Sequence, residues 1–325
     1  MQGITRRRLL GAAAATGTTA RPAIGFAQGA FPNRPVRIIL PGPPGSSSDV
    51  PLRAMADSLQ QTLAQPIVID NRPGAGGMTA ATQLLSSRPD GHTLGQLSVS
   101  VFRIPFMAPN VAFDPLRDCT FVAQLGSYTF GVAVRFDSFS KTWDDLVAWA
   151  RRNPDRLNYA VSGIGTSGHI AMEIIGRRAE VQWSPVPYSG SIAAVNAVLS
   201  GSTNAVVDAA SWAPMVRDGT LRLLAVATAR RAARYPDVPT FLELGYGYVT
   251  TSPYGIAGPR GLDAAYVSIL ERAFAAAVQD PKVLSVMTSL DQIADFKGAR
   301  EYEASMREFV AAEHGILEAI GLLRR

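Results

Sequence analysis

The sequence predicts an α/β protein of two lobes, each a parallel, doubly wound sheet flanked by helices. Short apolar runs rich in Val and Ile alternate with stretches whose apolar residues recur at helical spacing, as in parallel sheets that helices cover on both faces. At 325 residues the chain exceeds one typical domain, which favours two such lobes. An apolar content of 47% with 18% charged residues fits a well-packed protein rather than a disordered chain.

The most informative unit is the first, in which a strand, a glycine-rich loop and a helix follow in order. Residues Val36–Leu40 form an unbroken apolar run, and the Pro and Gly residues of 41–45 end it. Three serines at 46–48 supply hydroxyls, and Asp49 is placed to cap the helix that continues to Leu63. Backbone N–H groups and hydroxyls at the positive end of a helix suit a small anion.

The same pattern continues through the rest of the first lobe. The expected elements are strands at 66–70, 93–99 and 121–125 and a helix at 78–86, and a further strand at 129–134 lies just beyond this lobe. A second glycine-rich loop, 71–77, precedes that helix. Tyr128 lies where the chain is expected to leave the first lobe.

A second α/β series follows Tyr128. Its expected strands are 157–161, 183–186, 204–208 and 221–228, and its expected helices begin near residues 142, 170, 192 and 213. Residues 250–257 are then predicted to return to the first lobe as a strand, and two long amphipathic helices end the chain. The first lobe is thus predicted to comprise 28–127 and 252–325, and the second lobe 128–251.

Residues 1–27 are predicted to be an export signal. Thr5–Leu10 contains three arginines in a twin-arginine-like pattern, and a short run rich in Ala and Gly follows. Small residues at Gly25 and Ala27 place the cleavage after Ala27, and the run is too short and too weakly apolar to span a membrane. Removal of this segment takes away four arginines and no acid, so the net charge falls from +5 to +1. A nucleic-acid partner therefore loses its main support.

Disulfide and metal chemistry find little support in the sequence. Cys119 is the only cysteine, so an intrachain disulfide is not possible. His92, His169 and His314 are scattered and have no cysteine partners, so a structural zinc site is not expected. Each histidine is better explained by a surface or helix-cap position.

Two enzyme classes are the alternatives: an exported serine hydrolase and a dinucleotide-dependent enzyme. Residues 163–168 match Gly-x-Gly-x-x-Gly between a strand and a helix, but no acidic residue follows at the end of the next strand to hold a ribose. Ser167 and His169 lack nucleophile-elbow spacing, because the histidine follows only two residues later. No Lys follows the glycines, as a nucleotide-binding phosphate loop requires. Hydroxyls and backbone amides with almost no fixed cation favour reversible capture of a carboxylate between the lobes, without cofactor or metal.

The chain resembles the Bug family, the extracytoplasmic solute receptors of tripartite tricarboxylate transporters, over residues 31–322. No single motif is specific, but their order and spacing are. The match rests on 31–36 (FPNRPV), 41–49 (PGPPGSSSD), 70–77 (DNRPGAGG), 89–94 (PDGHTL), 157–160 (LNYA), 163–169 (GIGTSGH), 186–188 (VPY), 235–240 (YPDVPT) and 252–259 (SPYGIAGP).

The resemblance implies a hinged, two-lobed periplasmic binding protein of the type II-like fold, with no catalysis. It implies a monomer that binds a small carboxylate and meets membrane transporter subunits transiently, without inserting in the membrane. The ligand-binding positions that it implies are Pro43, Gly45, Ser46, Ser47, Ser48 and Asp49 in the first lobe and Gly165, Thr166, Ser167 and His169 in the second. Asp208 stands where the family often has an acid that can meet a ligand amine.

The chain departs from the family pattern in the first loop. Gly42 replaces an aromatic or bulky residue, and Ser46–Ser48 replace two glycines and a threonine. In the second loop, Gly168 stands where serine is usual. We expect Gly42 to enlarge the pocket and the serines to add hydrogen-bond donors, which would change the identity of the ligand but not the fold.

Overall fold

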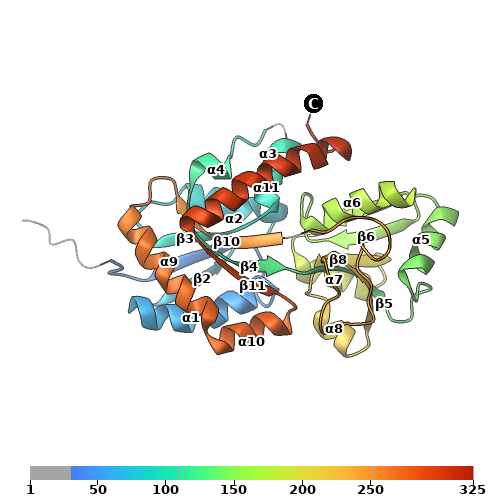
Figure 1. The fold of residues 1–325 in the computed structure, drawn as a ribbon, viewed down its shortest axis with the longest axis horizontal. Coiled ribbons are helices and arrows are strands. Elements are labelled where there is room, and N and C mark those ends of the chain that lie inside the picture. Colours follow the sequence, from blue (N-terminus) through green and yellow to red (C-terminus); the bar gives the residue numbers. More distant parts are fainter. Residues whose placement is uncertain (1–30, 109, 251, 325) are drawn as a thin grey trace, which may run out of the picture. The chain divides into compact units, whose positions relative to one another are not determined.

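The computed structural model of the protein describes residues 31–108, 110–250 and 252–324 (Figure 1). The predicted export signal, 1–27, lies outside the described residues. These residues form two sheets, each with its own helices. No helix among them is long and apolar enough to cross a membrane.

The first sheet has six strands in the order β11-β4-β10-β3-β1-β2. Its strands are β1 (Val36–Leu40), β2 (Ile67–Asn71), β3 (Thr93–Ser98), β4 (Cys119–Tyr128), β10 (Ser252–Pro259) and β11 (Ile293–Gly298). The helices around it are α1 (Asp49–Leu63), η1 (Ala75–Gly77), α2 (Met78–Leu85), α3 (Ser100–Met107), α4 (Pro115–Asp118), α9 (Ala264–Gln279), α10 (Pro281–Ser289) and α11 (Ala299–Ala319). We call this sheet and its helices lobe 1.

The second sheet has five strands in the order β7-β6-β8-β5-β9. They are β5 (Phe130–Arg135), β6 (Leu157–Val161), β7 (Trp183–Pro187), β8 (Ala205–Ala209) and β9 (Leu221–Val226). The helices around it are α5 (Trp143–Arg152), α6 (Ser167–Ala179), α7 (Ser191–Leu199) and α8 (Ala213–Arg217). We call this sheet and its helices lobe 2.

The sheets are mixed, whereas the sequence predicts parallel ones. Strands β1, β2 and β3 are parallel, as are β6, β7 and β8. In contrast, β10 runs antiparallel to both of its neighbours, and so does β5. The reason is the connection: β5 follows β4 after a single residue and β10 returns the chain from lobe 2, so neither arrives through a strand–helix–strand crossover, which keeps strands parallel.

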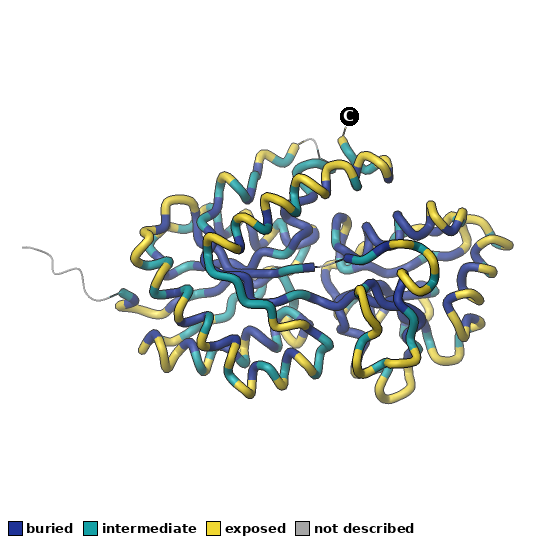
Figure 2. Tube along the Cα trace, viewed as in Figure 1, coloured by how far each residue is buried: buried dark blue, intermediate teal, exposed yellow. Residues whose placement is uncertain are grey.

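Helices cover both faces of the first sheet, as a doubly wound arrangement requires. Apolar residues of α2, α3 and α11 pack on one face, and α1 packs with α9 and α10. In lobe 2 the apolar residues of α7 and α8 share a core with the strands, while α6 contacts β5 and β8. The strands of both sheets are mostly buried, and exposed residues lie on the outward turns of the helices (Figure 2). The predicted capping box at Thr142 and Asp145 is present at the start of α5.

Candidate functional site

A cavity of about 100 Å³ lies between the lobes, and segments from both sheets line it. Six of the predicted site residues line it: Pro43, Ser47, Ser48, Thr166, Ser167 and Asp208. The segments follow the carboxyl ends of β1, β3, β6, β7 and β8. Ligand sites of open α/β sheets typically lie at this edge.

Five α-helices begin at this cavity, three from lobe 1 and two from lobe 2. Ser48 is the N-cap of α1, Gly77 is the N-cap of α2, Ser100 is the first residue of α3, Ser167 opens α6 and Ser191 opens α7, and all five residues line the cavity. The N-terminus of a helix carries a partial positive charge and presents N–H groups. Five such ends around one small space make a positive field without any cationic side chain among the described lining residues.

Asp208 is the only residue with a charged side chain among the described residues that line the cavity. It lies in the middle of lobe 2 at the end of β8, almost fully buried, and its Oδ2 has no hydrogen-bond partner within the described chain. Burial raises the pKa of Asp208, and hydrogen bonds from Ala209, Ser162 and Ser211 oppose that rise only in part. The carboxyl group thus offers one open position to whatever fills the cavity.

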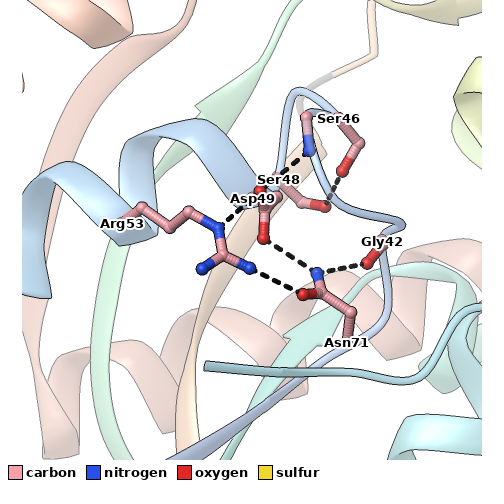
Figure 3. Close-up of polar contacts among 7 residues, drawn as sticks. Gly42, Ser46, Ser48, Asp49, Arg53 and Asn71 are labelled. Carbon is pink, nitrogen blue, oxygen red and sulfur yellow. Dashed lines mark hydrogen bonds and ion pairs between the residues drawn. The ribbon is translucent and has the colours of Figure 1, made fainter. Parts of the chain in front are cut away.

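A polar network fixes the first loop, and Asp49 is its centre (Figure 3). The Asp49 Oδ2 accepts hydrogen bonds of 2.8 Å from the Gly45 N–H and from Arg53 Nε, and its Oδ1 accepts one of 2.8 Å from Asn71 Nδ2. Asn71 also donates to the Gly42 carbonyl, and Arg53 donates to Asn71 Oδ1. Burial would raise the pKa of Asp49, but the hydrogen bonds from Arg53, Asn71 and Gly45 together lower it.

The position of Asp49 differs from the prediction that it caps the helix. Ser48 is the N-cap of α1, and Asp49 is the first helical residue. Asp49 does not line the cavity, and neither do Gly45 and Ser46. The carboxylate instead binds the N–H of Gly45, whose φ of +79° lies in the left-handed region that glycine tolerates.

Gly42 does not leave open space in the first loop. A methyl group added at Gly42 would overlap the hydroxyl oxygens of Ser48 and Ser46. These two hydroxyls are hydrogen-bonded to each other at 3.0 Å (Figure 3). Gly42 lines the cavity, and hydroxyl groups occupy the space beside it.

Gly165 of the second loop and His169 in the first turn of α6 are hydrogen-bonded to each other and do not line the cavity. The Gly165 N–H donates to His169 Nδ1 at 3.3 Å, so this nitrogen is the unprotonated one. Thr166 lines the cavity, but its hydroxyl donates to the Gly163 carbonyl at 2.8 Å. His169 is buried, and this burial together with the nearby Arg103 charge lowers its pKa to about 4. The imidazole is thus a neutral support for the loop.

The lowered pKa of His169 predicts a loss of stability in acid. A group whose pKa falls on folding contributes stability above its unfolded pKa, and this stability is lost as the pH falls through the folded value. The window is therefore between the ordinary value of 6.5 and about 4, and the full effect is about 3 kcal/mol. We expect His169→Gln, which keeps an acceptor for Gly165, to lose less stability than the wild type between pH 7 and 4.5 in urea unfolding. Equal losses in both proteins would contradict this assignment.

The residues that the sequence reasoning missed are mainly serines at the starts of helices and the ends of strands. Further hydroxyls line the cavity at Ser98, Ser100, Ser162, Ser189, Ser191 and Ser252. Tyr128, predicted only as the exit from the first lobe, also lines it and accepts a hydrogen bond from Gln96. Apart from Ser252, these serines end a strand, open a helix or lie in the loop between the two, so the edge rule for α/β sheets could have found them. Nowhere in the described ranges do three possible metal-ligating side chains gather.

Comparison with known proteins shows which family the chain is similar to. Residues 52–322 match the family described as "Tripartite tricarboxylate transporter family receptor" (TctC). A Cupriavidus necator protein from the gbd 5′ region is 37% identical over 321 residues, which cover 99% of this chain and 98% of that protein.

Two solved structures are similar along their whole length. The MatC protein of Rhodopseudomonas palustris with bound malate has a TM-score of 0.81 at 28% identity and covers 89% of this chain and 99% of its own. A second R. palustris protein, solved with adipate, has a TM-score of 0.85 at 26% identity and covers 90% of this chain and 98% of its own. Together with the family match, they confirm both the two-lobed fold and the resemblance found in the sequence. The chain therefore belongs to the TctC family of tripartite tricarboxylate transporter receptors.

Proposed function

We propose that this protein is a periplasmic receptor that captures a small organic carboxylate between its lobes and delivers it to the membrane subunits of a tripartite tricarboxylate-type transporter. The observation that carries the proposal is the meeting of five helix N-termini at one cavity that no cationic side chain lines among the described residues. Such a field attracts a carboxylate, while the absence of an ion pair favours release. The malate and adipate bound by two structural relatives are of this chemical class.

The proposed roles of the predicted site residues fall into two groups. Those that line the cavity contact the ligand: Pro43, Ser47, Ser48, Thr166, Ser167 and Asp208. Those that do not line it hold the two loops in shape: Gly45, Ser46, Asp49, Gly165 and His169. The open Oδ2 of Asp208 is suited to an ammonium or hydroxyl group on the ligand.

The organisation of the whole chain is also part of the proposal. We propose export of a folded protein through a twin-arginine-type signal, with cleavage near Ala27, and function as a monomer. The boundary near residue 128 is supported by the passage from β4 in the first sheet to β5 in the second. The boundary near residue 251 is supported by the passage from β9 in the second sheet to β10 in the first.

Catalysis is not part of this function, because the family consists of solute receptors. The local geometry agrees with a receptor. The Ser167 hydroxyl donates to Ser252 at 3.0 Å, and His169 Nδ1 accepts from a backbone N–H, so the two side chains are not joined as nucleophile and base. A dinucleotide site at Gly163–Gly168 would need an acidic residue at the end of the next strand to hold the ribose. That strand is β7, which reads WSPVP and contains no acid.

The test is binding by calorimetry with malate, adipate and a panel of other mono- and dicarboxylates, after native mass spectrometry of the protein purified from its own periplasm. We expect one acid to bind and none to be turned over. A retained nicotinamide or flavin, or failure of every acid to bind, would refute the proposal.

Ser48→Ala is expected to weaken binding of that acid about tenfold to a hundredfold. The Ser48 hydroxyl lines the cavity, and a hydrogen bond to a charged group contributes about 1.5–3 kcal/mol. Ser46→Ala is the matched control, because it removes the partner hydroxyl, which lies outside the cavity lining. We expect the control to change the affinity much less. Equal effects would mean that the serine pair matters only for the shape of the loop.

A further inference from the structure

A buried ion pair lies directly behind the cavity. Arg103 of α3 and Glu313 of α11 are joined by two hydrogen bonds of 2.7 Å, from Nε to Oε2 and from Nη2 to Oε1. Arg103 is fully buried, and the Phe309 ring lies 5.1 Å from its guanidinium carbon. Burial of an ion pair is costly, so a buried pair beside a binding cavity calls for a role.

The third nitrogen of Arg103 points away from Glu313 and reaches lobe 2. Its Nη1 donates to the Ser167 hydroxyl at 3.1 Å and to the Gly165 carbonyl at 3.4 Å. Ser167 in turn donates to the hydroxyl of Ser252 at 3.0 Å. Ser167 and Ser252 line the cavity, whereas Arg103 does not. The cation is thus one side chain away from the space that the ligand would occupy.

The chemistry of these groups fixes the direction of the hydrogen bonds from Arg103 through Ser167 to Ser252. A guanidinium can only donate hydrogen bonds, so the Ser167 oxygen must accept from Arg103. The Ser167 proton is then directed to Ser252, whose oxygen accepts it. The proton of Ser252 is left to point elsewhere, and Ser252 faces the cavity. Each bond in such a chain polarises the next.

We propose that Arg103 is a positioning residue for the ligand: through Ser167 it orients Ser252 to donate its proton to a ligand carboxylate. This inference rests on the proposed function and deepens it. Arg103 would supply positive potential without a direct ion pair to the ligand. Glu313 balances the charge of Arg103, and the two serines separate the guanidinium from the ligand. This series of hydrogen bonds also joins the lobes, since Arg103 lies in lobe 1 and Ser167 in lobe 2. Ligand binding and contact between the lobes are thus linked through the same hydroxyls.

The main test replaces the ion pair by apolar residues of similar size, in the variant Arg103→Met/Glu313→Met. This double change removes the charge without leaving an unpaired buried one. We expect its affinity for malate or adipate, whichever the wild type binds, to fall at least tenfold. Ser252→Ala is expected to lose a similar factor, and the two changes combined should lose little more than either alone. The matched control is Arg307→Met/Glu303→Met, an exposed pair on the same helix α11, which should not change the affinity.

Two readouts separate this role from a merely structural one. Glu313→Gln keeps Arg103 and removes the balancing charge, so we expect carboxylate affinity to stay the same or rise up to tenfold, even though the melting temperature falls. A structural role predicts weaker binding in Glu313→Gln as well. In addition, the preference for the acid over its uncharged amide should fall in the double variant. The Glu313→Gln readout does not use the double variant, so it decides the matter even if the double variant fails to fold.

The outcomes distinguish the two proposals. If the wild type binds no acid of the panel, the proposed function fails and the role of Arg103 fails with it. If the wild type binds but Ser252→Ala, or a folded double variant, binds equally well, only the role of Arg103 is refuted. A weaker Glu313→Gln, by the same factor as Ser252→Ala, would also refute it.

Discussion

Replacement of Asp49 by alanine is expected to lower the free energy of unfolding by about 3 kcal/mol and to remove detectable carboxylate binding. Asp49 is 1% exposed and accepts three hydrogen bonds, from Gly45, Arg53 and Asn71. Without the carboxylate, these donors lose their common acceptor and the loop loses the contact that holds the N–H of Gly45. Ser47 and Ser48, which line the cavity, lie between the residues of this contact.

Urea unfolding and calorimetric titration of the variant measure the two effects. Asp70→Ala is the matched control, because Asp70 pairs with Arg72 and Arg37 near the surface of the neighbouring strand β2. Surface pairs of this kind contribute about 0–1 kcal/mol, so we expect little change. If the Asp49 variant binds as the wild type does, the network does not position the loop.

The lowered pKa of Asp49 gives the same prediction a pH dependence. Its contribution to stability is fully present above the unfolded pKa of about 4 and is lost as the pH falls through the lowered folded value. Asp49→Asn should therefore remove part of the wild-type loss of stability as the pH falls below about 4. This window lies mainly below that of His169, so the two titrations can be separated.

The strand–loop–helix units were predictable because each has a strong local signal. An apolar β-branched run, a Gly- or Pro-rich break and helical spacing specify β1, α1 and β6 almost to the residue, whereas α6 begins at Ser167, three residues before the predicted start. The signal fails where these marks are absent. Helix α3 starts directly after β3 without a capping hydrogen bond and contains Pro105, and strand β11 is half polar and little buried. Neither element was predicted, although α3 supplies both Ser100 and Arg103.

The candidate site was only partly predictable for a related reason. Local sequence identifies a loop that follows a strand, but which side chains of that loop point into the cavity depends on the rest of the fold. Asp49 and His169 are turned into their own loops by backbone N–H groups at Gly45 and Gly165. The link from Arg103 to Glu313 spans 210 residues, and no sequence pattern marks it.

Contacts between the lobes extend well beyond the cavity, and arginines of lobe 2 make several of them. Arg177 donates to the Ile320 carbonyl at the end of α11, Arg234 to the Thr288 carbonyl and Arg217 to the Ser289 carbonyl at the end of α10. The C-terminus of a helix carries a partial negative charge that favours such cations. The cavity is therefore formed by an arrangement of the lobes that has its own polar contacts. Its geometry should depend on how closely the two lobes can approach each other.

Gly163→Ala is expected to weaken ligand binding tenfold to a hundredfold while the protein stays folded. Gly163 lies in the second loop of lobe 2, and a methyl group there would come within 2.9 Å of the Cα and N atoms of Gly76 in lobe 1. These are backbone atoms that cannot rotate away, so the lobes would have to stay further apart. Gly76 and Thr166 line the cavity on either side of this contact. A wider gap would separate the helix N-termini of the two lobes from a shared carboxylate.

The matched control is Gly219→Ala, because it isolates backbone strain from the clash. Gly219 has a φ of +78° and Gly163 a φ of +144°, so alanine is strained at both positions, at a cost of about 1–3 kcal/mol. A methyl group at Gly219, however, meets nothing within 4 Å. Calorimetric titration of both variants with the acid that the wild type binds, beside their urea unfolding curves, measures the difference. We expect both to lose stability and only Gly163→Ala to lose affinity, and equal affinities would mean that the ligand does not need the two lobes this close.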